Sequence, residues 1–301
     1  MLQGFTRRSN SLSKSETEWI KERHKITDQN LKWYLRLANM EDIEGVSTDQ
    51  FIDDLDRSIN IGLAFSGGGY RAMLTAAGEI SGLDNRTDGI MEYGLPILPA
   101  VSYVSGLSGG SWFLSTLAFN NWTSVQDIIN TRGQKDAVWD LKDSIANPHG
   151  AFFFLGDWIE VFKETYDKKS AGFNTSITDL WSRALSRHMF SKSSNYGVSM
   201  LFSDIRDYPV FKNHEMPFPL VVAVGRAPGT VIGSSTSTVF EFGPFELGSW
   251  DPSLRSFVDL KYIGTDLAGG YPTHNNSTCV AGLDNVSYTL QPIFCPQEIK
   301  I

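Results

Sequence analysis

The sequence predicts an α/β fold with a mixed, largely parallel central sheet flanked by helices and with an aromatic helical insertion. Two segments, residues 59–80 and 99–119, each run from a strand-like stretch through a glycine-rich turn into a helix-like stretch. Strands followed by crossover helices pair in parallel, so two such units indicate an α/β sheet. The aromatic, helix-like residues 150–205 form the predicted insertion.

The composition is that of an ordinary globular protein. The chain has 301 residues, of which 41% are hydrophobic and 20% charged, and this length suits one large domain or two ordinary ones. The formal net charge is −8 and the sequence pI is about 5.2. No basic stripe occurs, so nucleic acid is not an expected partner.

The N-terminal part predicts a helix outside the sheet. Residues 1–10 are expected to be disordered. Residues 11–40 predict an outer helix packed on the core, because apolar residues from Trp19 onward recur at helical spacing. Ser15 and Glu18 fit a capping box at the start of this helix.

The strands of the predicted sheet are short. Residues 59–65, INIGLAF, alternate apolar side chains as a strand does, and consecutive glycines end this strand before a helix over 72–80. Residues 218–225 predict a buried strand, and residues 237–254 a strand followed by a rigid turn. The chain after Gly264 is rich in Gly, Asn, Thr and Ser and predicts loop.

The aromatic segment allows two interpretations. Its large apolar residues are Phe152, Phe153, Phe154, Leu155, Trp158, Ile159 and Phe162. Such a cluster most often forms core. The alternative is a lid or an interfacial surface, because aromatic side chains are enriched where apolar and wet environments meet.

Residues 106–110, Gly-Leu-Ser-Gly-Gly, are a candidate nucleophile elbow centred on Ser108. The Gly-x-Ser-x-Gly pattern alone is weak evidence, but here a strand precedes it and a helix follows. An elbow holds its serine in strained backbone geometry, which small neighbours tolerate. The following helix points its N-terminus at the site and favours developing negative charge.

The other glycine turn, Ser66 to Arg71, is a candidate oxyanion site. Consecutive glycines leave backbone N–H groups unshielded, and such groups can hold an oxyanion. Arg71 suits a phosphate or carboxylate on the substrate, or is only a surface ion-pair partner. Ser66 is an alternative nucleophile that lacks a preceding glycine. The turn does not fit a nucleotide phosphate loop, which needs Gly-Lys-Ser/Thr.

A serine nucleophile needs a base. The histidines are His24, His149, His188, His214 and His274. Each is expected to be exposed or structural, and His274, the one nearest the end, lies beside two glycosylation sequons. A carboxylate within hydrogen-bond reach can accept the serine proton instead.

Sequons and cysteines point to the secretory pathway. Asn-x-Ser/Thr sequons occur at Asn85, Asn121, Asn174, Asn275, Asn276 and Asn285, each in a polar, turn-like setting where a glycan could be attached. The start of the chain has no apolar signal-peptide core. Cys279 and Cys295 could form one disulfide in a secreted chain or remain free thiols.

The sequence resembles the fungal phospholipase B (lysophospholipase) family, whose catalytic domain is related to the cytosolic phospholipases and to patatin. SGGGYRAM followed by SGLSGGSW carries the resemblance first. Further similar segments, in family order, are LDNRTDG (83–89), NNWTSVQ (120–126), DKKSAGFN (167–174), FKNHEMPFP (211–219), FEFGPFELGSWDP (240–252) and VAGLDN (280–285). The resemblance covers nearly the whole chain from about residue 11.

The resemblance implies a role for each matching residue. Ser108 corresponds to the nucleophile, Gly68 and Gly69 to the oxyanion-hole glycines, and Arg71 to the arginine that engages the substrate phosphate. It implies a serine–aspartate dyad and hydrolysis of phospholipid and lysophospholipid acyl esters at a membrane or micelle surface, with no metal or organic cofactor. It also implies a secreted, periplasmic, cell-wall or surface-anchored glycoprotein.

The chain departs from the family at the base. The family aspartate lies in an Asp-Gly-Gly motif, which this chain lacks. Asp266 in TDLAGG is the nearest similar segment, but it does not lie where the order of the family motifs places that aspartate. Residues 1–301 are therefore expected to be the N-terminal portion of one catalytic domain, with 59–125 holding the oxyanion turn and elbow and 150–205 a cap-like region. Leader, anchor and base are expected elsewhere, which would leave this fragment nearly inactive. The alternative is a catalytically inactive, lipid-binding or structural relative.

Overall fold

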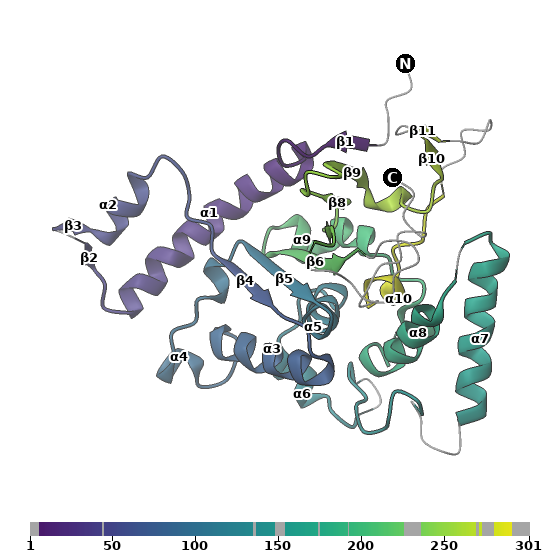
Figure 1. The fold of residues 1–301 in the computed structure, drawn as a ribbon. Helices are drawn as coiled ribbons and strands as arrows, with labels where there is room; N and C mark the ends of the chain where they lie inside the picture. Colours follow the sequence, from purple (N-terminus) through teal and green to yellow (C-terminus); the bar gives the residue numbers. More distant parts are fainter. Residues whose placement is uncertain are drawn as a thin grey trace.

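The computed structural model describes residues 6–43, 45–134, 137–147, 154–173, 175–191, 193–225, 236–268, 271–272 and 280–290. Its centre is a seven-stranded sheet, drawn in Figure 1. The strands follow the spatial order β1 (Thr6–Arg8), β9 (Ser256–Asp259), β8 (Glu246–Ser249), β7 (Val239–Phe242), β6 (Phe218–Val224), β5 (Tyr103–Leu107) and β4 (Gly62–Phe65).

The expected mixed sheet is confirmed, but most of its strand pairs are antiparallel rather than parallel, and the parallel part is confined to one end. β4 pairs with β5 and β5 with β6 in parallel, whereas the four pairs from β6 to β1 are antiparallel. The crossover helices are α3 (Gly69–Leu83) after β4 and α5 (Gly109–Phe119) after β5. Both strand–turn–helix units therefore lie side by side at the parallel end.

The N-terminal segment differs from the expectation in two respects. Residues 6–8 are not disordered but form β1, which pairs with β9 at the sheet edge. The outer helix, α1 (Lys14–Leu37), is capped by Ser13 rather than Ser15, because the Ser13 side chain accepts a hydrogen bond from the Glu16 backbone N–H at 3.1 Å.

The remaining elements are mostly short. The helices are α2 (Thr48–Asp53), α4 (Ile90–Tyr93), α6 (Val125–Asn130), α7 (Phe154–Ser170), α8 (Ile177–Met189), α9 (Pro209–Lys212) and α10 (Val286–Thr289), with 3₁₀ turns at 98–100, 194–197, 202–207 and 260–262. Two small hairpins pair β2 (Asp42–Ile43) with β3 (Val46–Ser47) and β10 (Leu267–Ala268) with β11 (Tyr271–Pro272).

The hydrophobic core is built around α5, every residue of which is buried. Phe113 packs edge-on against Phe65 of β4, and Phe119 against Phe190 and Phe202. Figure 1 shows α7 and α8 on the opposite side of the molecule from the outer part of α1, and α7 is the outermost helix there. Within the described part of the chain, no helix has the length and apolar character needed to cross a bilayer.

Candidate active site

Ser108 joins β5 to α5 in an unusual backbone conformation. Its φ of 52° and ψ of −119° lie where non-glycine residues are rarely found, and the strain must be held by the surrounding structure. The Ser108 carbonyl accepts hydrogen bonds from the Trp112 N–H at 3.0 Å and the Ser111 hydroxyl at 2.6 Å. These bonds fix the first turn of α5, so the half-buried Ser108 side chain projects from a rigid corner.

The two glycine turns contact each other through their backbones. A Cβ placed on Gly109 would lie 2.2 Å from the Gly69 carbonyl oxygen, and one on Gly110 would lie 2.4 Å from the Phe65 carbonyl oxygen. Such distances exclude any side chain, because the atoms approached belong to the backbone. The two glycines after the serine are therefore required by the packing of α5 against the start of α3 and the end of β4.

This packing brings Ser108 to the first glycine turn. A Cβ on Gly67 would lie 2.9 Å from the Ser108 Cβ and 3.5 Å from its Oγ. The next two residues, Gly68 and Gly69, have φ of 143° and 64°, in the region that favours glycine, and they begin α3. The serine hydroxyl and the N-terminus of α3 thus share one small region, as the sequence predicts.

Arg71 lies on the exposed side of the same turn. It lines a pocket of about 510 Å³ formed by the end of β4 and the first turns of α3, together with Ser66, Gly67 and Gly68. Arg71 is exposed and has no ion-pair partner within the described ranges. Ser108 does not line this pocket itself, although its side chain contacts Gly67, which does.

Comparisons with known proteins identify the family. Residues 61–291 match the model of the lysophospholipase catalytic domain. Lysophospholipase 3 of Saccharomyces cerevisiae is 45% identical over 292 residues, and the lysophospholipase of Kluyveromyces lactis 46% over 294 residues. Each alignment covers 95% of this chain. The chain belongs to the lysophospholipase catalytic domain family.

The resemblance found in the sequence is thereby confirmed. The chain spans only 42% and 45% of the lengths of those two relatives. Human GIVD cytosolic phospholipase A2 has a similar fold, with a TM-score of 0.68 at 17% identity, over 97% of this chain and 33% of the human one. The match confirms the expected phospholipase-type architecture.

Among the described residues, no side chain hydrogen-bonds to Ser108 Oγ. His24 bonds to Asn60 on the surface, and partial burial beside Trp19 lowers the pKa of His214. His149 and His274 lie outside the described residues. Asp266 directly precedes β10 and is half-buried.

Sequence reasoning missed a cluster of three aromatic rings beside the first glycine turn, Ser66 to Arg71. The half-buried ring of Tyr70, which follows the three glycines, packs edge-on against Trp112 and His188, with centroids 5.8 and 6.4 Å away. Burial raises the Tyr70 pKa. His188 is fully buried, and its Nδ1–H donates to the Asp140 carbonyl oxygen at 2.6 Å. The position of Tyr70 directly after the glycines could have indicated that it lies near the site. No pattern in the sequence around His188 indicates that it contacts Tyr70.

The predicted glycosylation sequons differ in accessibility. Asn85 and Asn121 are exposed and line one pocket of about 430 Å³. Asn285 is half-buried and accepts the Tyr288 N–H as the N-cap of α10, so it is less accessible than the sequence predicts. The other predicted modification sites, Asn174, Asn275, Asn276, Cys279 and Cys295, lie outside the described residues.

Proposed function

We propose that this chain carries the nucleophile and the oxyanion site of an enzyme that hydrolyses acyl esters of phospholipids and lysophospholipids. One observation carries the proposal: the strained Ser108 lies against Gly67, where the glycine turn begins α3. Family membership supplies the class of substrate, a lysophospholipid.

In the proposed reaction, Ser108 Oγ attacks the acyl carbonyl carbon. The backbone N–H groups of Gly68 and Gly69 hold the resulting oxyanion, where preorganised donors stabilise the charge that develops in the transition state. The ester C–O bond then breaks, and the alcohol takes the proton that the base removed from Ser108. Water hydrolyses the acyl-serine by the same steps and releases the fatty acid. As the family resemblance implies, this proposed reaction needs no metal or organic cofactor.

The base in this proposal is an aspartate outside residues 1–301, paired with Ser108 as in the family resemblance. Arg71 orients the substrate phosphate, a role that its exposed guanidinium in the pocket beside Gly68 supports. We further propose that the protein passes through the secretory pathway, is glycosylated at its exposed sequons, and meets its substrate at a membrane or micelle surface.

A fluorophosphonate probe tests the nucleophile. We expect the probe to label the full-length protein that contains residues 1–301 and its Ser66→Ala variant, which is the matched control, but not its Ser108→Ala variant. Circular dichroism must show that all three are folded. If labelling persists in Ser108→Ala but is absent in Ser66→Ala, the nucleophile is Ser66 rather than Ser108.

The second candidate function is a lipid-binding relative without catalysis, favoured by the lack of a hydrogen-bond partner for Ser108 Oγ within the described ranges. A folded full-length protein that is not labelled, and that releases no fatty acid from lysophosphatidylcholine, would support it.

Arg71→Ala separates phosphate recognition from ester chemistry. We expect it to lower kcat/KM for lysophosphatidylcholine by about 10- to 100-fold, because a hydrogen bond to a charged group contributes about 1.5–3 kcal/mol. The rate with a short uncharged ester should change little. Equal losses with both substrates would instead assign Arg71 to the chemical step or to folding.

A further inference from the structure

Helix α7 presents its apolar face to solvent. The exposed fractions of Leu155, Ile159, Phe162 and Tyr166 are 73%, 67%, 56% and 68%. Their spacing of four, three and four residues places them on one side of the helix, hereafter the α7 stripe. A surface helix of a globular protein ordinarily turns such a stripe toward the core.

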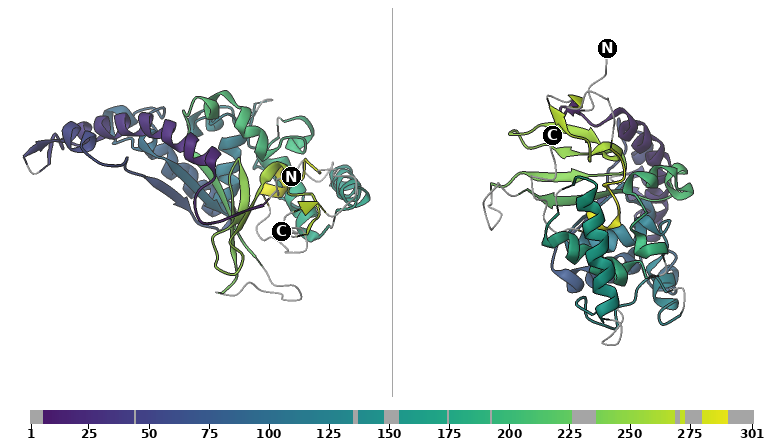
Figure 2. Two further views of the ribbon diagram at one scale, coloured as in Figure 1. Left: turned by 90° about the horizontal axis from the view of Figure 1, so that it is seen from above. Right: turned by 90° about the vertical axis from the view of Figure 1, so that its right-hand side faces the viewer.

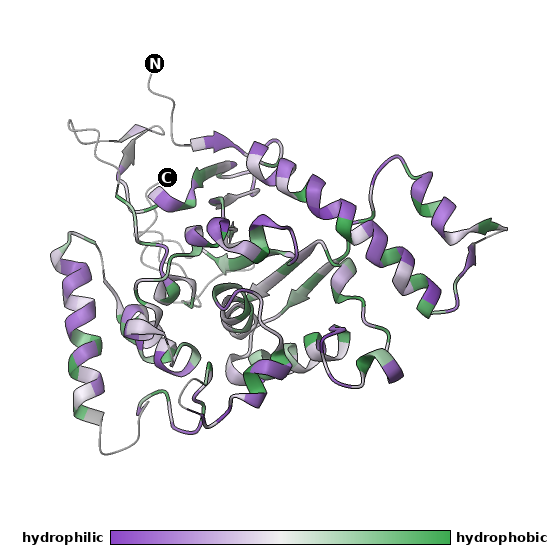
Figure 3. Cartoon of the chain, turned by 180° about the vertical axis from the view of Figure 1, so that it is seen from behind, coloured by the Kyte–Doolittle hydropathy of each residue, from purple (hydrophilic) through white to green (hydrophobic). Residues whose placement is uncertain are grey.

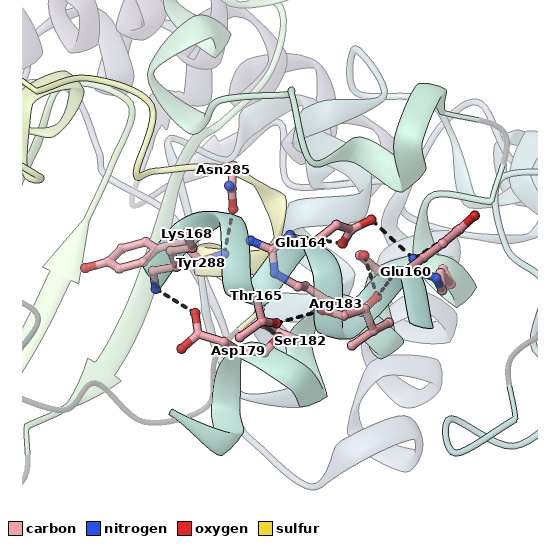
Figure 4. Close-up of polar contacts among 12 residues, drawn as sticks. Glu160, Glu164, Thr165, Lys168, Asp179, Ser182, Arg183, Asn285 and Tyr288 are labelled. Atoms are coloured by element: carbon pink, nitrogen blue, oxygen red, sulfur yellow. Dashed lines mark hydrogen bonds and ion pairs between the residues drawn. The ribbon is translucent and has the colours of Figure 1, made fainter. Parts of the chain in front are cut away.

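The charged face of α7 is turned inward instead. Glu164 pairs with Arg183 of α8 at 3.0 Å and with Arg187 at 3.2 Å, and Glu160 is 3.4 Å from Arg187. Lys168 pairs with Asp179 at 2.6 Å. Figure 4 labels Glu160, Glu164, Lys168, Asp179 and Arg183 among these side chains.

The ion pairs fix the rotation of α7. The Arg187 side chain is fully buried, and its guanidinium also lies 4.7 Å from the ring of Tyr196. Turning the α7 stripe inward would remove the carboxylates that neutralise this arginine, and an unpaired buried charge is strongly destabilising. The outward direction of the stripe is therefore determined by the contacts of α7 with α8.

Two lysines border the α7 stripe on its exposed side. Lys163 lies four residues after Ile159, and Lys169 three residues after Tyr166, so both are neighbours of the stripe on the helix surface. Both are exposed. Apolar and aromatic side chains bordered by lysines are typical of helices that lie in the membrane interface, where the cations meet lipid phosphates.

Nothing in the described part of the chain covers the stripe. Figure 2 (right) looks onto α7, and no described element lies in front of it. In Figure 3 hydrophilic and hydrophobic residues alternate along α7 at the edge of the molecule. The inner neighbour of α7, helix α8, reaches the glycine turn through the contact of His188 with Tyr70.

We propose that the α7 stripe docks on a lipid surface, with its apolar side chains in the headgroup–acyl boundary and Lys163 and Lys169 beside the phosphates. The choice of lipid over another partner rests on the proposed function, because a lysophospholipid substrate resides in such surfaces. It also rests on the charge of the stripe's border, which complements phosphate. Docking through α7 would place α8 and the Tyr70 side of the glycine turn behind the attached helix.

Flotation with vesicles of phosphatidylcholine, with and without phosphatidylglycerol, tests the proposal. The test variant is Ile159→Ser/Phe162→Ser, and the matched control is Met91→Ser/Tyr93→Ser, which removes comparably exposed apolar side chains from α4. We expect the test variant to lower the partition coefficient at least about tenfold and the control to leave it unchanged. Lys163→Gln/Lys169→Gln should weaken binding severalfold, and only to vesicles that contain phosphatidylglycerol.

Three outcomes would overturn the proposal. They are a parent chain that does not float with vesicles, a test variant that binds as well as the parent, and a parent dimer that Ile159→Ser/Phe162→Ser makes monomeric in sedimentation. The last would assign the stripe to a second copy of the chain.

Fatty-acid release from a soluble short-chain ester by the full-length protein, which includes the proposed base, reports on the proposed function separately. If the Ile159→Ser/Phe162→Ser variant loses vesicle binding but still hydrolyses the soluble ester, the result supports docking through α7. A chain that binds vesicles through α7 and never reacts at Ser108 overturns the catalytic proposal alone.

Discussion

The units β4–α3 and β5–α5 share one sequence pattern but differ in their surroundings. β5 lies between two parallel neighbours, and all of α5 is buried. β4 is the edge strand, and the buried residues of α3 are Met73, Ala76, Ala77 and Ile80, all on one side. The interior unit holds the strained Ser108, whereas the edge unit offers glycines and Arg71 to a solvent-facing pocket.

The difference shows how one local pattern can serve two purposes. A residue in a strained conformation persists only where its surroundings over-determine it, and a helix buried on every side supplies those constraints. A half-exposed helix cannot, but its first turn stays open to a ligand. Burial therefore favours Ser108 over Ser66 as the nucleophile.

The largest expected effect is on the core of the interior unit. Phe113→Ala should lower the free energy of unfolding by about 3–5 kcal/mol, because it empties a fully buried aromatic site. Leu74→Ala on the exposed side of α3 is the matched control and should cost about 0.5 kcal/mol or less. Urea denaturation measures both, and similar values would contradict the contrast between the helices.

Gly109→Ala should break the contact between the units. The added Cβ meets the Gly69 carbonyl oxygen, so α3 and α5 must separate, at a cost of about 3 kcal/mol. If Ser108 depends on this contact, fluorophosphonate labelling should also fall in the folded fraction. A variant with unchanged stability and labelling would show that the turns do not need to touch.

The stability of the interior unit should depend on pH through Glu16. Burial raises the Glu16 pKa from 4.5 to about 7, and Tyr103 at the start of β5 donates to this carboxyl group. Between these values the folded chain holds a proton that the unfolded chain releases, so stability falls as pH rises from about 4.5 to 7. The expected loss is about 3 kcal/mol.

Glu16→Gln tests the assignment, because glutamine keeps the acceptor without titrating. Urea denaturation at several pH values should show a smaller slope in this variant, with a remainder from Glu241, whose pKa is also raised by burial. An unchanged slope would assign the pH dependence to other groups.

The smallest effect is expected from Gly78→Ala on the exposed side of α3. No atom lies within 4 Å of the added Cβ, and alanine is favoured over glycine within a helix. The variant should gain about 0.5–1 kcal/mol, which thermal denaturation can detect. Gly78→Ala and Gly109→Ala together test the comparison, because the same substitution should raise the free energy of unfolding in the β4–α3 unit and lower it in the β5–α5 unit.

The sequence by itself determined the local backbone structure of the site. The glycines at 67–69 and 109–110, the strands before them and the helices after them follow from short-range rules of backbone conformation, and the ordered motifs indicated the family. Predictions from local patterns were wrong where a contact with a distant segment determines the structure. Residues 6–8 became β1 because β9 offers an unpaired edge.

Only the tertiary structure decided which faces are covered. Periodicity shows that Leu155, Ile159 and Phe162 share one side of α7, but it does not show which side packs. The buried Arg187 and Arg183 of α8 require the α7 carboxylates, so charge pairing turned the apolar side outward, against the interpretation of this cluster as core. Phe152, Phe153 and the side chain of Phe154 lie outside the described residues. A pattern within one helix cannot encode its neighbour, because the free energy that orients it belongs to contacts between distant segments.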